Sequence, residues 1–431
     1  MRVPPPRPAP DGALDRHPHP DPLPEGEGEE IRRSDAAQAA WLLTPGAVRT
    51  RAHEILALAE QDRAPHFTYR PERLPPTVDY VLATIRANYP DLAIPFHSRW
   101  RHFGVGGVDR WGALAQDLAG ESPAEIARIR FDLAVTSVLL DAGAGAAWRY
   151  REAGGGTYAR SEGLGVASFH LFRAGLFSAD PHRKLRAEAA ALRRLDEAAL
   201  EAGMQVTAAN PLVGIAGRAA LLRRLGEALA AQPALFGAAG RIGNLFDHLA
   251  GQAVAGRLEA SSILAALLRG FGTIWPGRHD MAGIALGDTW RHGDVLVPFH
   301  KLSQWLAYSL IEPLEAAGIA VTAIDGLTGL AEYRNGGLFL DLGVIVPRDA
   351  GLAHRVLAVD DEAVVEWRAL TVALLDRVAD GVRAALGMDA QSLPLAKVLE
   401  GGTWAAGRRI AAETRPGGPP PLAIASDGTV F

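Results

Sequence analysis

The chain has 431 residues, of which 48% are hydrophobic and 22% charged, and its net charge is −5. This is the composition of a globular protein without a basic stripe, so duplex nucleic acid is not an expected partner. Cysteine is absent, which excludes disulfides, thiolate nucleophiles and cysteine-ligated zinc. No apolar run is long enough to span a bilayer, so we expect no membrane partner and a cytoplasmic location.

The first 34 residues differ from the rest of the chain. They are rich in proline, glycine, histidine and acidic residues and contain no apolar stretch typical of a signal peptide. Such a segment buries too little apolar surface to offset its ordering entropy. We therefore predict a disordered low-complexity tail over residues 1–34. No convincing linker follows, so residues 35–431 are expected to form a single globular catalytic domain.

Helical patterns dominate beyond the tail. Ser122 can cap a helix that begins at Pro123, and Glu125 stands where a capping box requires an acid. Periodic apolar residues predict further helices over residues 184–202, 216–231, 299–317 and 361–386. Alternating apolar residues within 338–346 predict a short strand. No alternation of strands and helices occurs, so we predict a mainly α fold with few short strands.

The segment 98–103 (SRWRHF) places arginines beside aromatic rings and precedes a glycine-rich turn. Guanidinium groups next to aromatic planes and exposed backbone amides suit a phosphate or carboxylate ligand. A surface turn with structural ion pairs explains the same residues equally well.

Two further polar segments are candidates for ligand binding. Asp141 ends the helix that begins at Pro123 and could hold a substrate hydroxyl, or could cap the next turn. Ser161 and Glu162 follow a run of glycines, which indicates either a binding loop or the cap of another helix.

His300 and Lys301 lie in the first turn of the helix predicted over 299–317. The helix dipole disfavours positive charge there, so a cation in this place suggests a bound anion. A solvated lysine is the alternative.

The segment Leu327 to Leu330 (LTGL) is similar to the hairpin of helix-hairpin-helix glycosylases, in which an aspartate downstream acts on the N-glycosidic bond. Here Asp341 lies downstream, within an apolar stretch, where an acid is paired, used as a cap, or functional. Glu366 and Arg368 lie two residues apart in the helix predicted over 361–386 and do not face each other on it. No cofactor motif and no metal-ligand spacing is found, so we expect neither.

Several long segments resemble the uracil catabolism protein 4 family. The resemblance runs from about residue 36 to the C-terminus and is carried by SRWRHF (98–103), PFHKLSQW (298–305), GGTW (401–404) and SDGTVF (426–431), together with residues 139–145, 160–163, 327–346 and 366–376. It implies a role in uracil degradation after ring opening, when a urea group is attached to ribose. It also implies functional association with a uracil phosphoribosyltransferase and a relative of GTP cyclohydrolase II.

A more distant resemblance concerns queuosine salvage proteins. The residues around Phe299, the segment 341–347 and Glu366 to Ala369 (EWRA) are similar in type and order to those N-glycoside hydrolases. The resemblance implies a helical fold like that of helix-hairpin-helix DNA glycosylases. It also implies cleavage of a base from a ribose or ribose phosphate.

Together the resemblances lead to the hypothesis of a nucleosidase-like N-glycosyl hydrolase. The expected reaction is hydrolysis of the N-ribosyl bond of ribosylurea, or of its 5-phosphate, to urea and ribose (phosphate). A non-catalytic binding or scaffold protein of the same pathway and a ureide amidohydrolase remain alternatives.

The hypothesis assigns roles to residues. Asp341 or Glu366 is expected to be the catalytic carboxylate, because positive charge develops on the sugar as the bond breaks. The predicted substrate-binding residues are Ser98, Arg99, Trp100, Arg101, His102, Asp141, Ser161, Glu162, His300, Lys301, Gln304, Arg368 and Trp404. Among these, Lys301 with His300 and an arginine of the 98–103 segment would bind a phosphate, and Trp100 or Trp404 would wall the pocket.

Overall fold

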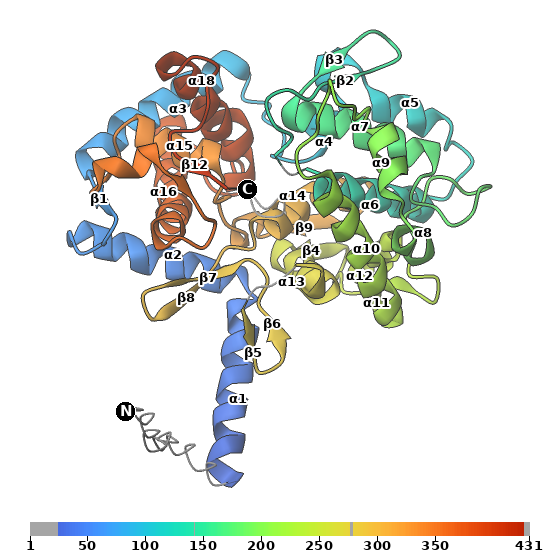
Figure 1. The fold of residues 1–431 in the computed structure, drawn as a ribbon, viewed down its shortest axis with the longest axis horizontal. Coiled ribbons are helices and arrows are strands. Elements are labelled where there is room, and N and C mark those ends of the chain that lie inside the picture. Colours follow the sequence, from blue (N-terminus) through green and yellow to red (C-terminus); the bar gives the residue numbers. More distant parts are fainter. Residues whose placement is uncertain (1–24, 142, 276–278, 426–431) are drawn as a thin grey trace, which may run out of the picture.

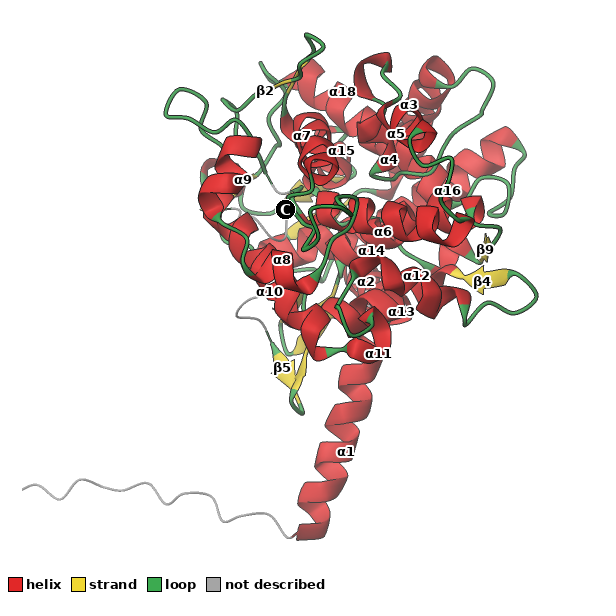
Figure 2. Cartoon of the chain, turned by 90° about the vertical axis from the view of Figure 1, so that its right-hand side faces the viewer, coloured by secondary structure: helices red, strands yellow, loops and turns green. Residues whose placement is uncertain are grey.

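The computed structural model describes residues 25–141, 143–275 and 279–425 (Figure 1). Most of these residues lie in α-helices, and the strands are short. The prediction of a mainly α fold is therefore confirmed. Of the predicted tail, residues 1–24 lie outside the described residues. The part from Glu25 on belongs to helix α1 (Glu25–Leu42), which projects from the body of the molecule (Figure 2).

The helices of the body form two groups, which Figure 1 shows side by side. In the first group α16 packs against α2 and α3, and α15 packs against α16 and α18. In the second group α6 packs against α7 and α12, and α10 packs against α8, α9 and α13. Helix α14 lies between the groups in this view and packs against α6 and α13. The first group comprises α2 (Pro45–Glu60), α3 (Leu74–Asn88), α15 (Tyr333–Asp341), α16 (Glu362–Leu386), α17 (Leu395–Val398) and α18 (Trp404–Thr414). The second comprises α4 (Trp100–Phe103), α5 (Arg110–Gln116), α6 (Pro123–Leu139), α7 (Arg160–Ala174), α8 (Ala189–Arg193), α9 (Glu197–Gly203), α10 (Ile215–Ala231), α11 (Pro233–Phe236), α12 (Leu245–Ala250) and α13 (Ala260–Phe271), and α14 covers Lys301–Ala316.

The strands of the described residues occur in pairs at the edges of the helical body. Four pairs are antiparallel: β1 (Phe67–Tyr69) with β10 (Ile345–Pro347), β2 (Tyr150–Arg151) with β3 (Thr157–Tyr158), β5 (Asp280–Met281) with β6 (Ile284–Ala285), and β7 (Thr289–His292) with β8 (Val295–Pro298). Two pairs are parallel: β4 (Arg257–Glu259) with β9 (Ala320–Thr322), and β11 (Val356–Leu357) with β12 (Ala423–Ile424).

One continuous cluster of buried apolar side chains runs through both groups of helices. It includes Phe131 of α6, Leu306 of α14 and Leu370 of α16, none of which exposes more than 2% of its surface. A shared core of this kind makes the body a single mainly α domain. None of the described helices is both long and apolar enough to cross a membrane.

Local signals in the sequence locate several helices correctly. The side chain of Ser122 accepts a hydrogen bond from the backbone amide of Glu125, so the predicted cap of α6 is confirmed. Helix α10 begins at Ile215 and ends at Ala231, and the long helix α16 begins after its cap, Asp361. The predictions over 216–231 and 361–386 are therefore confirmed within one residue at each end.

Two predicted elements are wrong. The helix expected over 184–202 is divided into α8 and α9, because Asp196 accepts a hydrogen bond from the amide of Ala198 and starts a new helix there. The strand expected within 338–346 is mostly helix. Residues up to Asp341 belong to α15, which Glu332 caps, and only Ile345–Pro347 forms a strand. The alternation of apolar residues was misleading because both faces of this short helix are covered.

Candidate functional site

A cavity of about 450 Å³ lies where the two groups of helices meet. This volume is within the range of small-molecule sites. Its walls come from the segment around α4, the end of α6, the start of α7, the starts of α14 and α15, and the start of α18 with the loop after it. The lining residues are His97, His102, Asp141, Gly143 to Ala146, Arg160, Ser161, Lys301, Trp305, Leu330, Glu332 to Arg334, Trp404 and Pro416 to Pro420.

Glu332 brings a buried carboxylate to the cavity. It is the N-cap of α15, where one oxygen accepts the amide hydrogen of Arg334 at 2.7 Å and the other that of Asn335 at 2.6 Å. Only 8% of the residue is exposed. Burial raises the pKa of Glu332, and the two amide hydrogen bonds and the charge of Lys301 oppose that rise. The carboxyl group is thus poised to hold or release a proton.

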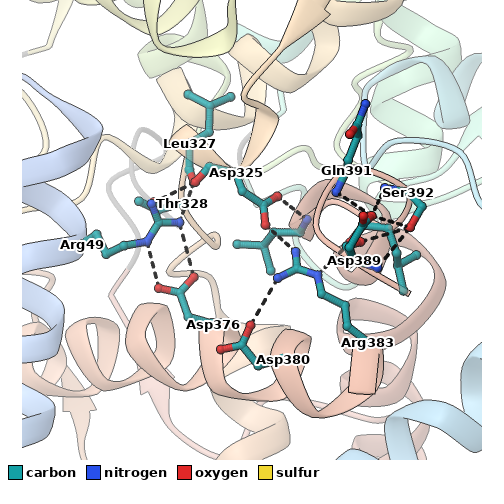
Figure 3. A network of polar contacts seen from close by, with 12 residues as sticks. Arg49, Asp325, Leu327, Thr328, Asp376, Asp380, Arg383, Asp389, Gln391 and Ser392 are labelled. Carbon is teal, nitrogen blue, oxygen red and sulfur yellow. Dashed lines mark hydrogen bonds and ion pairs between the residues drawn. The ribbon is translucent and has the colours of Figure 1, made fainter. Parts of the chain in front are cut away.

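The loop before Glu332 is fixed by polar contacts from three helices. Arg49 of α2 donates hydrogen bonds to the carbonyl oxygens of Asp325 and Leu327 and pairs with Asp376 of α16, as Figure 3 shows. Deeper in the molecule, Gln304 of α14 accepts the amide hydrogen of Thr328 at 3.0 Å. Because both ends of the 325–328 segment are tied down, the position of Glu332 is well defined. Gln304, a predicted substrate ligand, holds this loop and does not line the cavity.

Lys301, which is partly buried, brings an amine to the same cavity. Its ammonium group forms no hydrogen bond and no ion pair with any residue that the structure describes. Burial lowers the pKa of Lys301, and the nearby carboxylates of Glu332 and Asp141 oppose that shift. An amine without a fixed partner among the described residues is available to a ligand.

The start of α14 does not offer the anion site that its cations suggested. The backbone amide of Lys301 donates to the carboxylate of Asp288 at 3.0 Å, and Arg368 binds both oxygens of that carboxylate at 2.8 Å. Asp288 therefore supplies the negative charge that the helix dipole favours. The predicted ligand His300 contacts the carbonyl oxygen of Leu42 at 2.8 Å and lies outside the cavity lining, as does Arg368.

Asp141 and Ser161 form a second polar wall. The hydroxyl of Ser161 lies 2.9 Å from each carboxylate oxygen of Asp141, and Arg99 pairs with the same carboxylate at 3.0 Å. Arg99 is fully buried behind this wall and also donates to the hydroxyl of Ser137. Asp141 is thus held in place as a hydrogen-bond acceptor at the cavity surface.

Aromatic rings close the side of the cavity near α4. Trp305 contacts the rings of His97 and His102, with centroids 6.2 Å and 5.8 Å away, and the ring of Trp404 lies 5.8 Å from His97. Burial and the charge of Arg99 hold the pKa of His102 well below its usual value. His102 is therefore a neutral ring at physiological pH.

The loop Pro416 to Pro420 forms the roof of the cavity. Arg160 donates to the carbonyl oxygen of Gly417 at 3.3 Å, and Arg334 to that of Gly418 at 2.9 Å. Arg415 donates to the carbonyl oxygen of Pro419 at 2.9 Å and binds both carboxylate oxygens of Asp341 at 2.6 Å. Asp341 therefore lies outside the cavity lining and anchors the roof through Arg415.

Glu366, the other predicted catalytic acid, also lies elsewhere. Its carboxylate accepts the amide hydrogens of His66 and Phe67 and contacts Nε2 of His292 at 2.9 Å. It is completely buried in α16, where it joins β1 to β7. His66, Phe67 and His292 thus provide hydrogen-bond partners for both oxygens of the Glu366 carboxylate.

The remaining predicted ligands are not among the lining residues of the cavity. Glu162 pairs with Arg408 of α18. Ser98 and Arg101 both contact Glu312 near the end of α14, and Trp100 donates to the carbonyl oxygen of Ser309. Of the predicted binding residues, the cavity lining brings together His102, Asp141, Ser161, Lys301 and Trp404.

Several lining residues were not among the predicted substrate-binding residues, chiefly Glu332, Tyr333, Arg334, Trp305 and Arg160. A weak signal for Glu332 was present, since an acid shortly after the LTGL segment suits the positive end of a helix that begins there. Within the described residues, no group of three or more histidines, aspartates and glutamates is arranged to hold a metal ion.

Comparison with known proteins identifies the family. Residues 41–431 match the model of a family described as "Protein of unknown function (DUF1688)". The chain belongs to this family. It is 42% identical to "Protein urg3" of Schizosaccharomyces pombe over 402 residues, which cover 91% of this chain and 98% of that protein. It is 39% identical to "Uracil catabolism protein 4" of Lachancea kluyveri over 428 residues, which cover 89% of this chain and 97% of that protein.

Proposed function

We propose that this protein acts in uracil catabolism and hydrolyses the N-ribosyl bond of ribosylurea or of its 5-phosphate. The name of the Lachancea kluyveri relative supports the pathway. The resemblance to N-glycoside hydrolases supports the reaction. A cytoplasmic location and functional association with a uracil phosphoribosyltransferase and a GTP cyclohydrolase II-like protein belong to the same proposal.

The observation that carries the proposal is the buried carboxyl group of Glu332 in a cavity of small-molecule size. Breaking an N-ribosyl bond develops positive charge on the anomeric carbon and negative charge on the leaving nitrogen. A carboxyl group with a raised pKa can protonate the leaving group and then, as a carboxylate, stabilise the sugar cation. We therefore assign to Glu332 the role that the sequence suggested for Asp341 or Glu366.

Other lining residues have the chemistry to bind the substrate. Asp141, held by Arg99 and Ser161, can accept hydrogen bonds from ribose hydroxyls or urea amines. Trp305 and the neutral ring of His102 can exclude water from the reacting bond.

The test is release of urea by the purified protein from ribosylurea and, separately, from its 5-phosphate. Wild type is expected to release urea, and Glu332→Gln is expected to be slower by about 100- to 10,000-fold, the usual contribution of a general acid or base. Glu366→Gln serves as a control for loss of a buried carboxylate outside the cavity. Both variants require circular dichroism to show that they are folded.

The preference between the two substrates shows which sugar form the cavity accepts. Absence of urea release from both substrates by folded wild type would sink the hydrolase proposal. Tight binding of intact ribosylurea without turnover would favour the non-catalytic intermediate-binding protein.

A further inference from the structure

Lysine is rare in this chain. The sequence contains three lysines, Lys184, Lys301 and Lys397, among 44 basic residues, so arginine carries nearly all of the positive charge. Lys184 is exposed, and Lys397 lies over the ring of Phe96 at 5.6 Å. Lys301 lines the cavity. Arginine keeps its proton in proteins, whereas a lysine removed from water can lose it. A lysine at this position can therefore act as a neutral amine.

The surroundings of Lys301 do not suit a bound anion. The carboxylates that act most strongly on the charge of Lys301 are those of Glu332 and Asp141. Both would repel a phosphate. The helix N-terminus beside it is already occupied by Asp288. The amine thus belongs to a residue that lines a cavity together with Glu332 and Asp141, and it has no fixed partner among the described residues. This is the environment of a nucleophile with a proton acceptor at hand.

We propose that Lys301 is a nucleophile that forms a covalent bond to the sugar of the substrate. This inference rests on the proposed N-ribosyl hydrolysis and adds a covalent intermediate to it. The neutral amine of Lys301 would attack the anomeric carbon as the bond from that carbon to urea breaks. The bonding electron pair leaves with the urea nitrogen, which takes a proton from Glu332.

The second half of the reaction releases the sugar. The attached nitrogen loses a proton to Glu332, the ring oxygen leaves the anomeric carbon and is protonated, and a protonated imine of open-chain ribose remains. Water adds to the imine carbon, the carbon–nitrogen bond breaks, and ribose and the free amine are regenerated. The sum is ribosylurea and water giving ribose and urea, without oxidation or reduction.

Burial supports the first step, because it lowers the pKa of the Lys301 ammonium and so increases the fraction of neutral amine. Glu332 shares the cavity with the amine and has a raised pKa, so it can return the proton between the steps. The roof loop and Trp305 limit the access of water before the imine has formed.

The experiment is reductive trapping of the full-length protein. Incubation with ribosylurea and cyanoborohydride is expected to attach a reduced pentose to Lys301, located by intact mass and peptide mapping, with loss of urea release as the adduct accumulates. The variants Lys184→Arg and Lys397→Arg are expected to trap and turn over like wild type. Lys301→Arg keeps the charge and is expected to lose trapping and to release urea at least about 100-fold more slowly. In Lys301→Ala, added methylamine is expected to restore part of the activity if the amine is the nucleophile.

The outcomes separate this inference from the proposed function. Urea release by wild type without an adduct on Lys301 would overturn the nucleophile and leave the hydrolase intact. Absence of urea release would overturn the hydrolase. In a parallel incubation with ribose and cyanoborohydride, an adduct confined to Lys301 supports a reactive amine. Equal labelling of the other lysines, or none at Lys301, counts against it.

Discussion

Asp341 and Glu332 make different contacts, and substitution of Asp341 tests which of them acts in catalysis. Asp341 is 6% exposed in its side chain and binds Arg415, which is 26% exposed, through two hydrogen bonds of 2.6 Å. Removing one partner of a fully buried pair costs about 3–5 kcal/mol, and an exposed pair is worth at most about 1 kcal/mol. For this partly exposed pair we expect Asp341→Asn to lower the free energy of unfolding by about 1–3 kcal/mol.

The same substitution should loosen the roof of the cavity, because Arg415 also holds the carbonyl oxygen of Pro419. We expect KM for ribosylurea to rise, while kcat falls by less than about 10-fold, since Asp341 does not line the cavity. Urea denaturation interferes with the product assay, so the free energy of unfolding is measured with guanidinium chloride and kcat and KM separately by urea release.

A matched control is Glu152→Gln. Glu152 binds Arg110 through both of its oxygens, is 12% exposed in its side chain, and does not line the cavity. It should lose a similar amount of stability with kcat and KM unchanged. If Asp341→Asn instead cuts kcat by 100-fold or more with stability intact, Asp341 is the catalytic acid and our assignment of Glu332 is wrong.

Two further predictions concern partly buried ionisable groups. The hydrogen bond from Arg110, and then that from His170, lowers the pKa of Glu152 to about 2. The stability that the ionised Glu152 contributes is therefore fully present above the ordinary pKa of a glutamate, and it is lost as pH falls from there toward the lowered pKa. The difference in free energy of unfolding between wild type and Glu152→Gln should therefore shrink between about pH 5 and about pH 3. Lys301→Met should raise the free energy of unfolding by about 1 kcal/mol, because it removes a partly buried ammonium group without a partner among the described residues. The exposed Lys184→Met is the control, and a loss of stability in Lys301→Met alone would show that the amine has a structural partner.

Much of the helical fold could be predicted because its signals are local. Ser122 caps α6 and Asp361 caps α16, and both helices carry apolar residues at helical spacing. The prediction failed where a local pattern had two explanations. The apolar residues up to Asp341 alternate like a strand, yet they fill both sides of a short helix packed between α16 and α18.

The relation between Glu332 and Asp341 could not be predicted from the strand pattern, which began after Glu332. In the structure they stand at opposite ends of α15, and nine residues of helix separate them by roughly 13 Å. Only the end that carries Glu332 reaches the cavity, and the end that carries Asp341 reaches Arg415. Lys301 and Asp141 could be selected from the sequence, because each lies at a helix end that the sequence marks.

The cavity combines groups that reduce stability with groups that hold them in place. Lys301 occupies the first position of α14, where the dipole disfavours a cation. Glu332 is buried, and the two amide hydrogen bonds from its own helix offset only part of the effect of burial on its pKa. Neither residue is part of the apolar core, and a neutral side chain of similar size at position 301 would remove the unfavourable cation from the helix N-terminus. The surrounding contacts, such as those of Arg49 and Gln304 with the loop before Glu332, are extensive and fully formed. A buried carboxyl group, and an amine without a partner among the described residues, line the same small cavity, which supports the proposal of chemistry there over passive binding or scaffolding.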